Sequence, residues 1–146
     1  MEYRELVIRA LKKLPDSYVP YSHFHVAAAL LSEDDTVFEG INIENASYTP
    51  TVCAERTAFF KAVSEGYRNF KAIAIVGCNE DALSSDKYKI NLEIPAFTPP
   101  CGVCRQVMRE FASPDEFEII LAKSPDDYKV YKLKELLPES FGPEFL

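Results

Sequence analysis

Two cysteine motifs, each placed where a helix is expected to begin, constrain this chain more than any other feature of its sequence. The first motif is Thr51–Arg56 (TVCAER), and the second is Pro99–Arg105 (PPCGVCR). Cys101 and Cys104 are three residues apart, so on the first turn of a helix they point to the same side. The partial positive charge at a helix N-terminus favours thiolate over thiol, and thiolate is the form that binds zinc. With Cys53, the two helix starts supply three sulfur ligands.

Three protein ligands leave the fourth position of a tetrahedral zinc ion open, which is typical of catalytic rather than structural zinc. The metal lowers the pKa of a water in that position towards neutrality. Glu55 follows Cys53 by two residues and therefore lies off the ligand's side of the helix, so we expect it to carry protons. Arg56 is expected to hydrogen-bond a thiolate and offset part of the negative charge around the metal.

Other interpretations of these residues remain open at this point. Cys101 and Cys104 alone would also suit a structural zinc site or a redox pair, and Arg56 could form a surface or interface salt bridge. A Cys-Ala-Glu at one helix start together with a Pro-Cys-x-x-Cys at another is the known signature of zinc deaminases. We interpret Cys78 as a small buried hydrophobe. His23 and His25 would face opposite sides of a strand, so we interpret them as non-ligands.

Length and charge limit the class of protein. The 146 residues fit a single domain, residues 1–146, with one hydrophobic core. The formal charge of −7 and the lack of a basic stripe favour a small substrate over a nucleic acid. No apolar stretch approaches the roughly 20 residues that would cross a membrane, and Met1–Lys13 does not resemble a signal peptide. We therefore expect a cytoplasmic protein, in which four cysteines favour metal or catalytic roles over disulfides.

The order of the predicted elements indicates an α/β fold with one sheet between helices on both faces. Helices are expected at Met1–Leu14, Ala54–Glu65 with Gly66 as its stop, Gly102–Phe111 and, as a short one, Lys134–Leu137. Strands are expected at His25–Leu31, Thr36–Ile43, Ala72–Val76, Phe117–Ala122 and Tyr128–Leu133, with the less regular Lys89–Ile94 as a further candidate. The tail Pro138–Leu146 contains two prolines and is expected to be extended.

The chain resembles the cytidine deaminase family over nearly its whole length. The matching blocks stand in the family's order and are Tyr21–Val26, Gly40–Tyr48, Cys53–Arg56, Pro100–Gln106, and Leu136–Pro138 with Phe141–Pro143. The resemblance implies a three-layer α/β/α fold with a mixed five-stranded sheet. It also implies hydrolysis of cytidine and deoxycytidine to uridine and deoxyuridine plus ammonia, a role in pyrimidine salvage, one Zn²⁺ per subunit and a homotetramer.

The resemblance also implies a role for each site residue. Cys53, Cys101 and Cys104 would bind zinc, and Glu55 would shuttle the proton. The substrate contacts would be Phe24 against the pyrimidine ring, Asn42 and Glu44 on the ribose hydroxyls, the backbone of Ala54 on the base, and Phe141 in a neighbour's site. Without the resemblance, Phe24 would be read as core, Asn42 and Glu44 as solvated loop residues, and Phe141 as tail packing.

Two departures and three alternatives accompany this interpretation. Ala27 stands where the family usually has Gly, and Cys78–Pro99 is longer than in compact members of the family. A deaminase for a related base such as blasticidin S is one alternative, and a polynucleotide-editing deaminase is another. The third alternative is a non-catalytic, zinc-stabilised binding module, which would have no need of Glu55 as a proton carrier.

Overall fold

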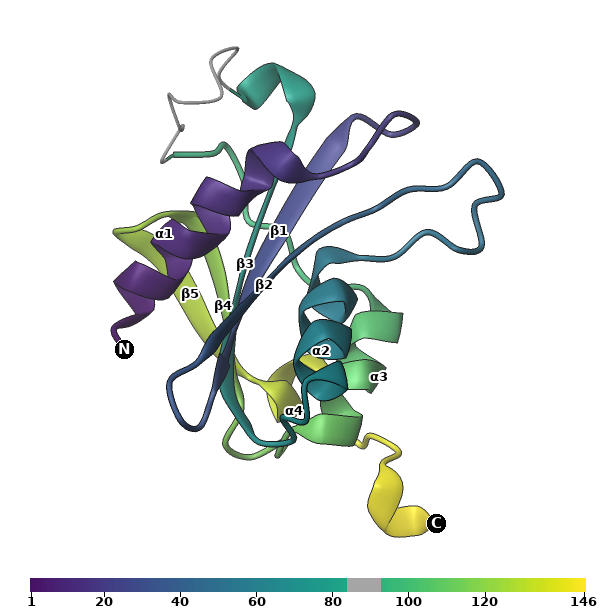
Figure 1. The fold of residues 1–146 in the computed structure, drawn as a ribbon. Helices are drawn as coiled ribbons and strands as arrows, with labels where there is room; N and C mark the ends of the chain where they lie inside the picture. Colours follow the sequence, from purple (N-terminus) through teal and green to yellow (C-terminus); the bar gives the residue numbers. More distant parts are fainter. Residues whose placement is uncertain (84–92) are drawn as a thin grey trace.

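A mixed five-stranded sheet forms the centre of the computed structural model, which describes residues 1–83 and 93–146 (Figure 1). The strand order is β2-β1-β3-β4-β5. Only β3 and β4 pair in parallel, and the other neighbours are antiparallel. The bounds are Phe24–Ser32 for β1, Val37–Ile41 for β2, Phe70–Asn79 for β3, Glu118–Ser124 for β4 and Asp127–Lys132 for β5. The predicted α/β architecture is confirmed.

Helices cover both faces of the sheet, as predicted (Figure 1). The first, α1 (Tyr3–Lys13), lies on one face, and α2 (Ala54–Ser64), α3 (Gly102–Phe111) and the short α4 (Leu133–Leu136) lie on the other. Because side chains alternate along a strand, each central strand contributes to both cores. This double burial explains why β1 and β3 are apolar almost throughout.

Ala27, which stands where the family usually has Gly, faces the α1 side of the sheet. Ala27 is fully buried in the core beneath α1, together with Ala29, Ala72 and Ala74. Its neighbour Val26 points towards the opposite core, against which it is packed. The methyl group of Ala27 therefore occupies the face of the sheet that carries no cysteine motif.

Both cysteine motifs lie at helix starts, as the sequence predicted. Cys53 is the residue before α2, and Cys101 is the residue before α3. The Cys101 Sγ accepts a hydrogen bond from the Cys104 backbone N at 3.4 Å, so the thiol also caps its helix. Phe59 of α2 and Phe111 of α3 stack with ring centroids 6.2 Å apart, which packs the two helices side by side.

Some sequence predictions need correction. The tail was expected to be extended, but Pro143–Phe145 forms a 3₁₀ turn, because Ser140 and Glu144 both bond to the buried Arg109 side chain. The candidate strand Lys89–Ile94 lies outside the described residues up to position 92, and residues 93–94 are not in a strand.

The expectation that His23 and His25 face opposite sides holds only if both lie in a strand, and His23 does not. His23 precedes β1 with a φ of 57°, so the alternation of a strand does not apply to it. Both rings approach one carboxylate, with His23 Nδ1 at 3.3 Å and His25 Nε2 at 3.6 Å from Glu80 oxygens.

The helices in the described part of the chain were also compared with the length and apolar character that a membrane span requires, and none of them meets both.

The close approach of β2 to α2 gives a test of the fold. A Cβ added at Gly40 would lie 2.3 Å from the Ala54 carbonyl oxygen and 2.6 Å from the Ala58 nitrogen, both of them backbone atoms of α2. We expect Gly40→Ala to lower the free energy of unfolding by about 2 kcal/mol, measured by urea denaturation. Gly102→Ala, whose Cβ would meet nothing within 4 Å, is the control and should not destabilise the protein.

Candidate active site

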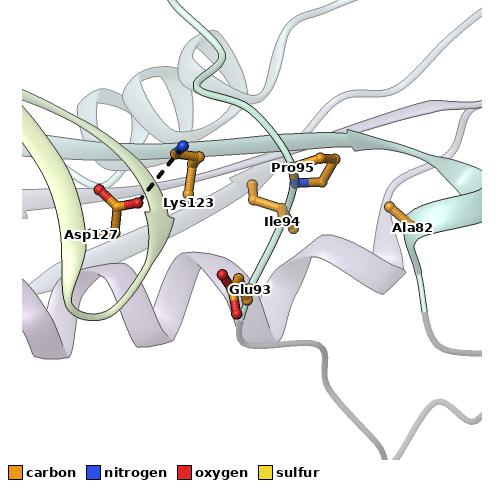
Figure 2. A pocket seen from close by; sticks show the side chains of 6 residues that line it. All are labelled: Ala82, Glu93, Ile94, Pro95, Lys123 and Asp127. Carbon is orange, nitrogen blue, oxygen red and sulfur yellow. Dashed lines mark ion pairs between the residues drawn. The ribbon is translucent and has the colours of Figure 1, made fainter.

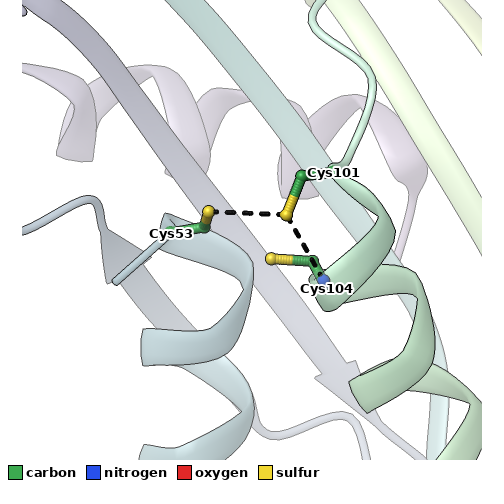
Figure 3. A group of neighbouring side chains, drawn as sticks. All are labelled: Cys53, Cys101 and Cys104. Carbon is green, nitrogen blue, oxygen red and sulfur yellow. Dashed lines mark hydrogen bonds between the residues drawn. The ribbon is translucent and has the colours of Figure 1, made fainter. Parts of the chain in front are cut away.

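Three cysteine sulfurs converge where α2 and α3 begin (Figure 3). The Sγ atoms of Cys53, Cys101 and Cys104 all lie within 4.8 Å of one another, and Cys53 Sγ is 3.7 Å from Cys101 Sγ. Cys101 is exposed, Cys53 is half-buried and Cys104 is buried. The cluster could therefore hold a metal ion that is anchored on its inner side and accessible from its outer side.

Charge in this cluster is concentrated on Cys53. A hydrogen bond with the Cys104 side chain, followed by one from Arg56, lowers the pKa of Cys53 to about 5. The Arg56 Nη2 donates to Cys53 Sγ at 3.3 Å. The same interaction with Cys53, together with burial, raises the pKa of Cys104. This pairing favours thiolate at Cys53 and thiol at Cys104. A metal ion bound by both sulfurs would have to displace the Cys104 proton.

Glu55 is a buried carboxyl next to these sulfurs. Its side chain lines a cavity with Cys53 and Cys101, and the residue is only 4 % exposed. Burial, followed by the nearby charge of Cys53, raises the pKa of Glu55 to about 7. A carboxyl group with a pKa near neutrality can both accept and return a proton, which is the property required of a general acid–base catalyst.

The cavity that contains Glu55 has a volume of about 160 Å³. Its lining combines apolar and polar side chains and consists of Val26, Asn42, Thr51, Val52, Cys53, Glu55, Thr98, Pro99 and Cys101. Asn42 is fixed by two bonds to β1: its Nδ2 donates to the Phe24 carbonyl at 2.9 Å, and its Oδ1 accepts from the Val26 nitrogen at 3.0 Å. The volume and the mixed lining of the cavity suit a small molecule with both apolar and polar groups.

A second, more open hollow of about 450 Å³ shares Thr51 with this cavity. Its other lining residues are Tyr21, Ser22, Glu44 and Tyr48. The Glu44 carboxylate accepts bonds from the Tyr21 and Ser22 nitrogens at 3.0 Å each, and from the Ser22 hydroxyl. Desolvation raises the pKa of Glu44, but the hydrogen bonds from Ser22 and Tyr21 outweigh it, so the pKa is lowered overall. The hollow therefore contains an anion, and none of the described residues that line it is cationic.

Three residues expected from the resemblance do not line either hollow. Phe24 is half-buried on β1, two residues before Val26 and on the same side of the strand. Ala54 is fully buried at the start of α2. Phe141 is 57 % exposed on the tail, where its ring stacks on Phe145 at 5.4 Å.

Five lining residues were given no role from the sequence. They are Val26, Thr51, Val52, Thr98 and Pro99. Four of them lie in or directly before a cysteine motif, where Thr51-Val52 lead into Cys53 and Thr98-Pro99 lead into Pro100 and Cys101. This position is the signal that could have found them, because a segment that leads into a ligand must pass along the edge of the site.

Another hollow, of about 490 Å³, lies elsewhere (Figure 2). Its lining residues are Ala82, Glu93, Ile94, Pro95, Lys123 and Asp127, and it contains an ion pair between Lys123 and Asp127 at 3.7 Å. It shares no lining residue with the cysteine cavity. The groups suited to metal binding and proton transfer are therefore gathered in the smaller cavity.

Comparison with known proteins gives consistent matches. Residues 1–118 match the family described as the cytidine and deoxycytidylate deaminase zinc-binding region. The chain is 42 % identical over 146 residues to a cytidine deaminase of Sporosarcina psychrophila, covering all of this chain and 96 % of that protein. It is also 42 % identical over 144 residues to that of Halalkalibacterium halodurans, covering 99 % of this chain and 97 % of that protein.

Solved structures match as well. The crystal structure of a cytidine deaminase from Burkholderia pseudomallei superimposes with a TM-score of 0.80 at 40 % identity, covering 97 % of this chain and all of the other. That of Mycobacterium tuberculosis gives 0.73 at 32 % identity, covering 97 % and 98 %. The likeness therefore extends over the sheet and all the elements that carry the site.

The sulfur cluster makes a prediction about metal content. Cys101→Ser should reduce the bound metal by at least about tenfold at equilibrium with a competing chelator, because a hard hydroxyl replaces a soft thiolate. Cys78→Ser is the matched control, since Cys78 is buried in the α1-side core and should leave metal content unchanged. Elemental analysis of the purified variants measures both. Equal metal in wild type and Cys101→Ser would contradict the ligand assignment.

Proposed function

Because the chain belongs to the cytidine and deoxycytidylate deaminase family, we propose that it hydrolyses cytidine and deoxycytidine to uridine and deoxyuridine, with release of ammonia. The observation that carries this proposal is the position of Glu55. It is a buried carboxyl with a pKa raised to about 7 in a cavity it shares with two of three clustered cysteines. A module that only bound or assembled would gain nothing from burying a carboxyl group beside a thiolate.

We propose zinc as the metal, one ion per subunit, held by Cys53, Cys101 and Cys104. Zn–S bonds of about 2.3 Å in a tetrahedral site place two sulfurs about 3.8 Å apart. The distance of 3.7 Å between the Cys53 and Cys101 sulfurs supports this assignment. Zinc in such a site supplies a Lewis acid that lowers the pKa of water enough to make it a nucleophile near neutral pH.

Glu55 would move the protons of the reaction. Its carboxylate takes a proton from the attacking water and gives it to N3 of the ring as the water oxygen bonds to C4. It then carries the second proton of that oxygen to the amino group, so that the C4–N bond breaks and ammonia leaves. The balance is one water consumed and one ammonia released. Arg56, which donates to Cys53 Sγ, offsets negative charge on the sulfurs.

The two hollows divide the substrate between base and sugar. We propose that the cavity of about 160 Å³ takes the pyrimidine, with Val26 on its wall. The contacts of Phe24 with the ring and of the Ala54 backbone with the base are proposed from the resemblance alone. Asn42, on the cavity wall, and Glu44, in the adjoining hollow, take the ribose hydroxyls. The Glu44 anion and the absence of a cation among the described lining residues disfavour a charged nucleotide.

Several finer predictions from the sequence and the resemblance remain proposals. They are the homotetramer, the reach of Phe141 into a neighbouring site, the cytoplasmic location, the role in pyrimidine salvage, and a single catalytic domain over residues 1–146. A polynucleotide substrate is disfavoured by the formal charge of −7. The exposure of Phe141, at 57 %, is compatible with a contact outside its own chain.

Ammonia release tests the function directly. Purified protein is assayed with cytidine, deoxycytidine, deoxycytidine 5′-phosphate, blasticidin S and single-stranded DNA, with and without a zinc chelator. We expect turnover of the two nucleosides, and loss of that turnover after chelation. Preferred turnover of blasticidin S, of the nucleotide or of DNA would replace the proposed substrate class, and no ammonia from any of them would reject the enzyme assignment.

Glu55→Gln tests the proton shuttle. The amide keeps the shape of the side chain but cannot accept a proton, so kcat should fall by at least about 100-fold. Zinc content and the urea midpoint should stay at or above the wild-type level, because a buried ionisable group is removed. Glu110→Gln, an exposed carboxyl on α3, is the matched control and should retain full turnover. Wild-type activity in Glu55→Gln would refute this role.

A further inference from the structure

Of the three clustered cysteines, Cys101 is preceded by the longest stretch without regular secondary structure. Cys104 lies inside α3, and Cys53 follows a bridge between Ile43 and Val52. Residues 93–101, in contrast, form neither helix nor strand. The position of Cys101 therefore depends on whatever side-chain contacts hold this segment.

The segment crosses the sheet between two parallel strands. The pairing of β3 with β4 ends at Ile75 and Leu121, although both strands continue beyond it. Past this point the Ile94 nitrogen donates to the carbonyl oxygen of Lys123 in β4 at 2.8 Å. The Thr98 hydroxyl then donates to the carbonyl oxygen of Gly77 in β3 at 3.3 Å. Residues 94–98 thus lie between the diverging ends of β3 and β4.

The crossing connects the two cores. Ile94 is 2 % exposed and belongs to the core beneath α1. Phe97, three residues later, packs against the core beneath α2 and α3. Thr98 and Pro99 then line the cysteine cavity, and Cys101 follows them. Any shift of Phe97 is therefore passed on to the cavity wall and to one proposed ligand.

Two cations hold the Phe97 ring in place. Lys123 Nζ lies 4.7 Å and Lys129 Nζ 4.6 Å from the ring centroid, both within the range of a cation–π interaction. The lysines come from β4 and β5, which pair antiparallel over most of their length. The ring is thus attached to a rigid hairpin.

Gly77 limits movement on the other side. A Cβ at Gly77 would lie 2.5 Å from the Thr98 hydroxyl oxygen and 3.0 Å from the Thr98 Cβ. The segment therefore lies directly against β3, with no space for a methyl group between them. The segment that leads to Cys101 is therefore held by β3 at Thr98 and by the β4–β5 hairpin at Phe97.

We propose that Phe97, clamped by Lys123 and Lys129, is a positioning residue that fixes Cys101 and the Thr98-Pro99 wall of the cavity. It contacts no substrate and acts through the segment that follows it. This inference rests on the proposed function, because it concerns the same metal and the same cavity. Its effect should appear in metal retention and in kcat, whereas KM should change less than kcat, because the proposed ribose contacts Asn42 and Glu44 lie on other segments.

The test uses zinc-loaded protein and a cobalt-substituted form of it. Phe97→Leu keeps an apolar side chain and removes the ring, and the double variant Lys123→Met with Lys129→Met keeps the ring and removes both charges. Lys71→Met, which removes an exposed lysine of β3 paired with Asp35, is the control. Zinc release to a chromogenic chelator, the cobalt–thiolate absorption bands, kcat, KM and the urea midpoint are measured for each.

For Phe97→Leu we expect zinc release about tenfold faster than wild type, a fall in kcat of similar size and altered cobalt bands. The double lysine variant should change in the same direction by a smaller factor, and Lys71→Met should match wild type. A lower urea midpoint in Phe97→Leu with wild-type zinc release, cobalt bands and kcat would overturn the proposal and leave Phe97 as packing only. Wild-type zinc release, cobalt bands and kcat in the lysine double variant would refute the role of Lys123 and Lys129 in holding Phe97.

Wild-type protein separates this proposal from the function on which it rests. If the wild type retains zinc and deaminates cytidine, an unaffected Phe97→Leu refutes only the positioning role. If the wild type neither binds zinc nor releases ammonia, the proposed function itself has failed, and the positioning role fails with it.

Discussion

The site depends on one packing constraint: two helices must begin next to each other on the same face of the sheet. Phe59 and Phe111 stack between α2 and α3, and α2 rests on β2 so closely that Gly40 has no room for a side chain. These contacts involve no catalytic group, yet they bring Cys53 to the start of α3. The sulfur cluster is therefore a product of core packing, and the local helix starts only determine which atoms face it.

Adjacent thiols and a carboxyl group in a half-buried cluster are unfavourable without charge compensation. The protein limits this cost by keeping Cys104 as a thiol beside the Cys53 thiolate, by a hydrogen bond from Arg56 to Cys53, and by a raised pKa at Glu55. The same features suit chemistry, because a bound cation would replace the Cys104 proton and a carboxyl group with a pKa near neutrality can exchange its own. The electrostatic strain of the site and its reactivity thus have the same origin.

The sequence predicted what is encoded locally. Cys53 and Cys101 precede helices because their motifs contain helix-start signals, and β1 and β3 are recognisable as apolar runs. The remaining parts depend on contacts between distant segments. The place of Thr98 and Pro99 next to a cysteine motif marks them as candidates, but their path between β3 and β4 is encoded by no local pattern. Strand periodicity could not place His23, because its left-handed backbone belongs to the turn before β1.

The crossing of residues 94–98 has a consequence for how variation should be distributed in this fold. A segment that passes between two strands connects the cores on the two faces of the sheet, so a substitution in one core can affect the other. Ile94 is anchored in the layer remote from the cysteines, and Phe97 reaches the other layer three residues later. We therefore expect substitutions at Ile94, in the core beneath α1, to disturb the cysteine cavity on the opposite face of the sheet.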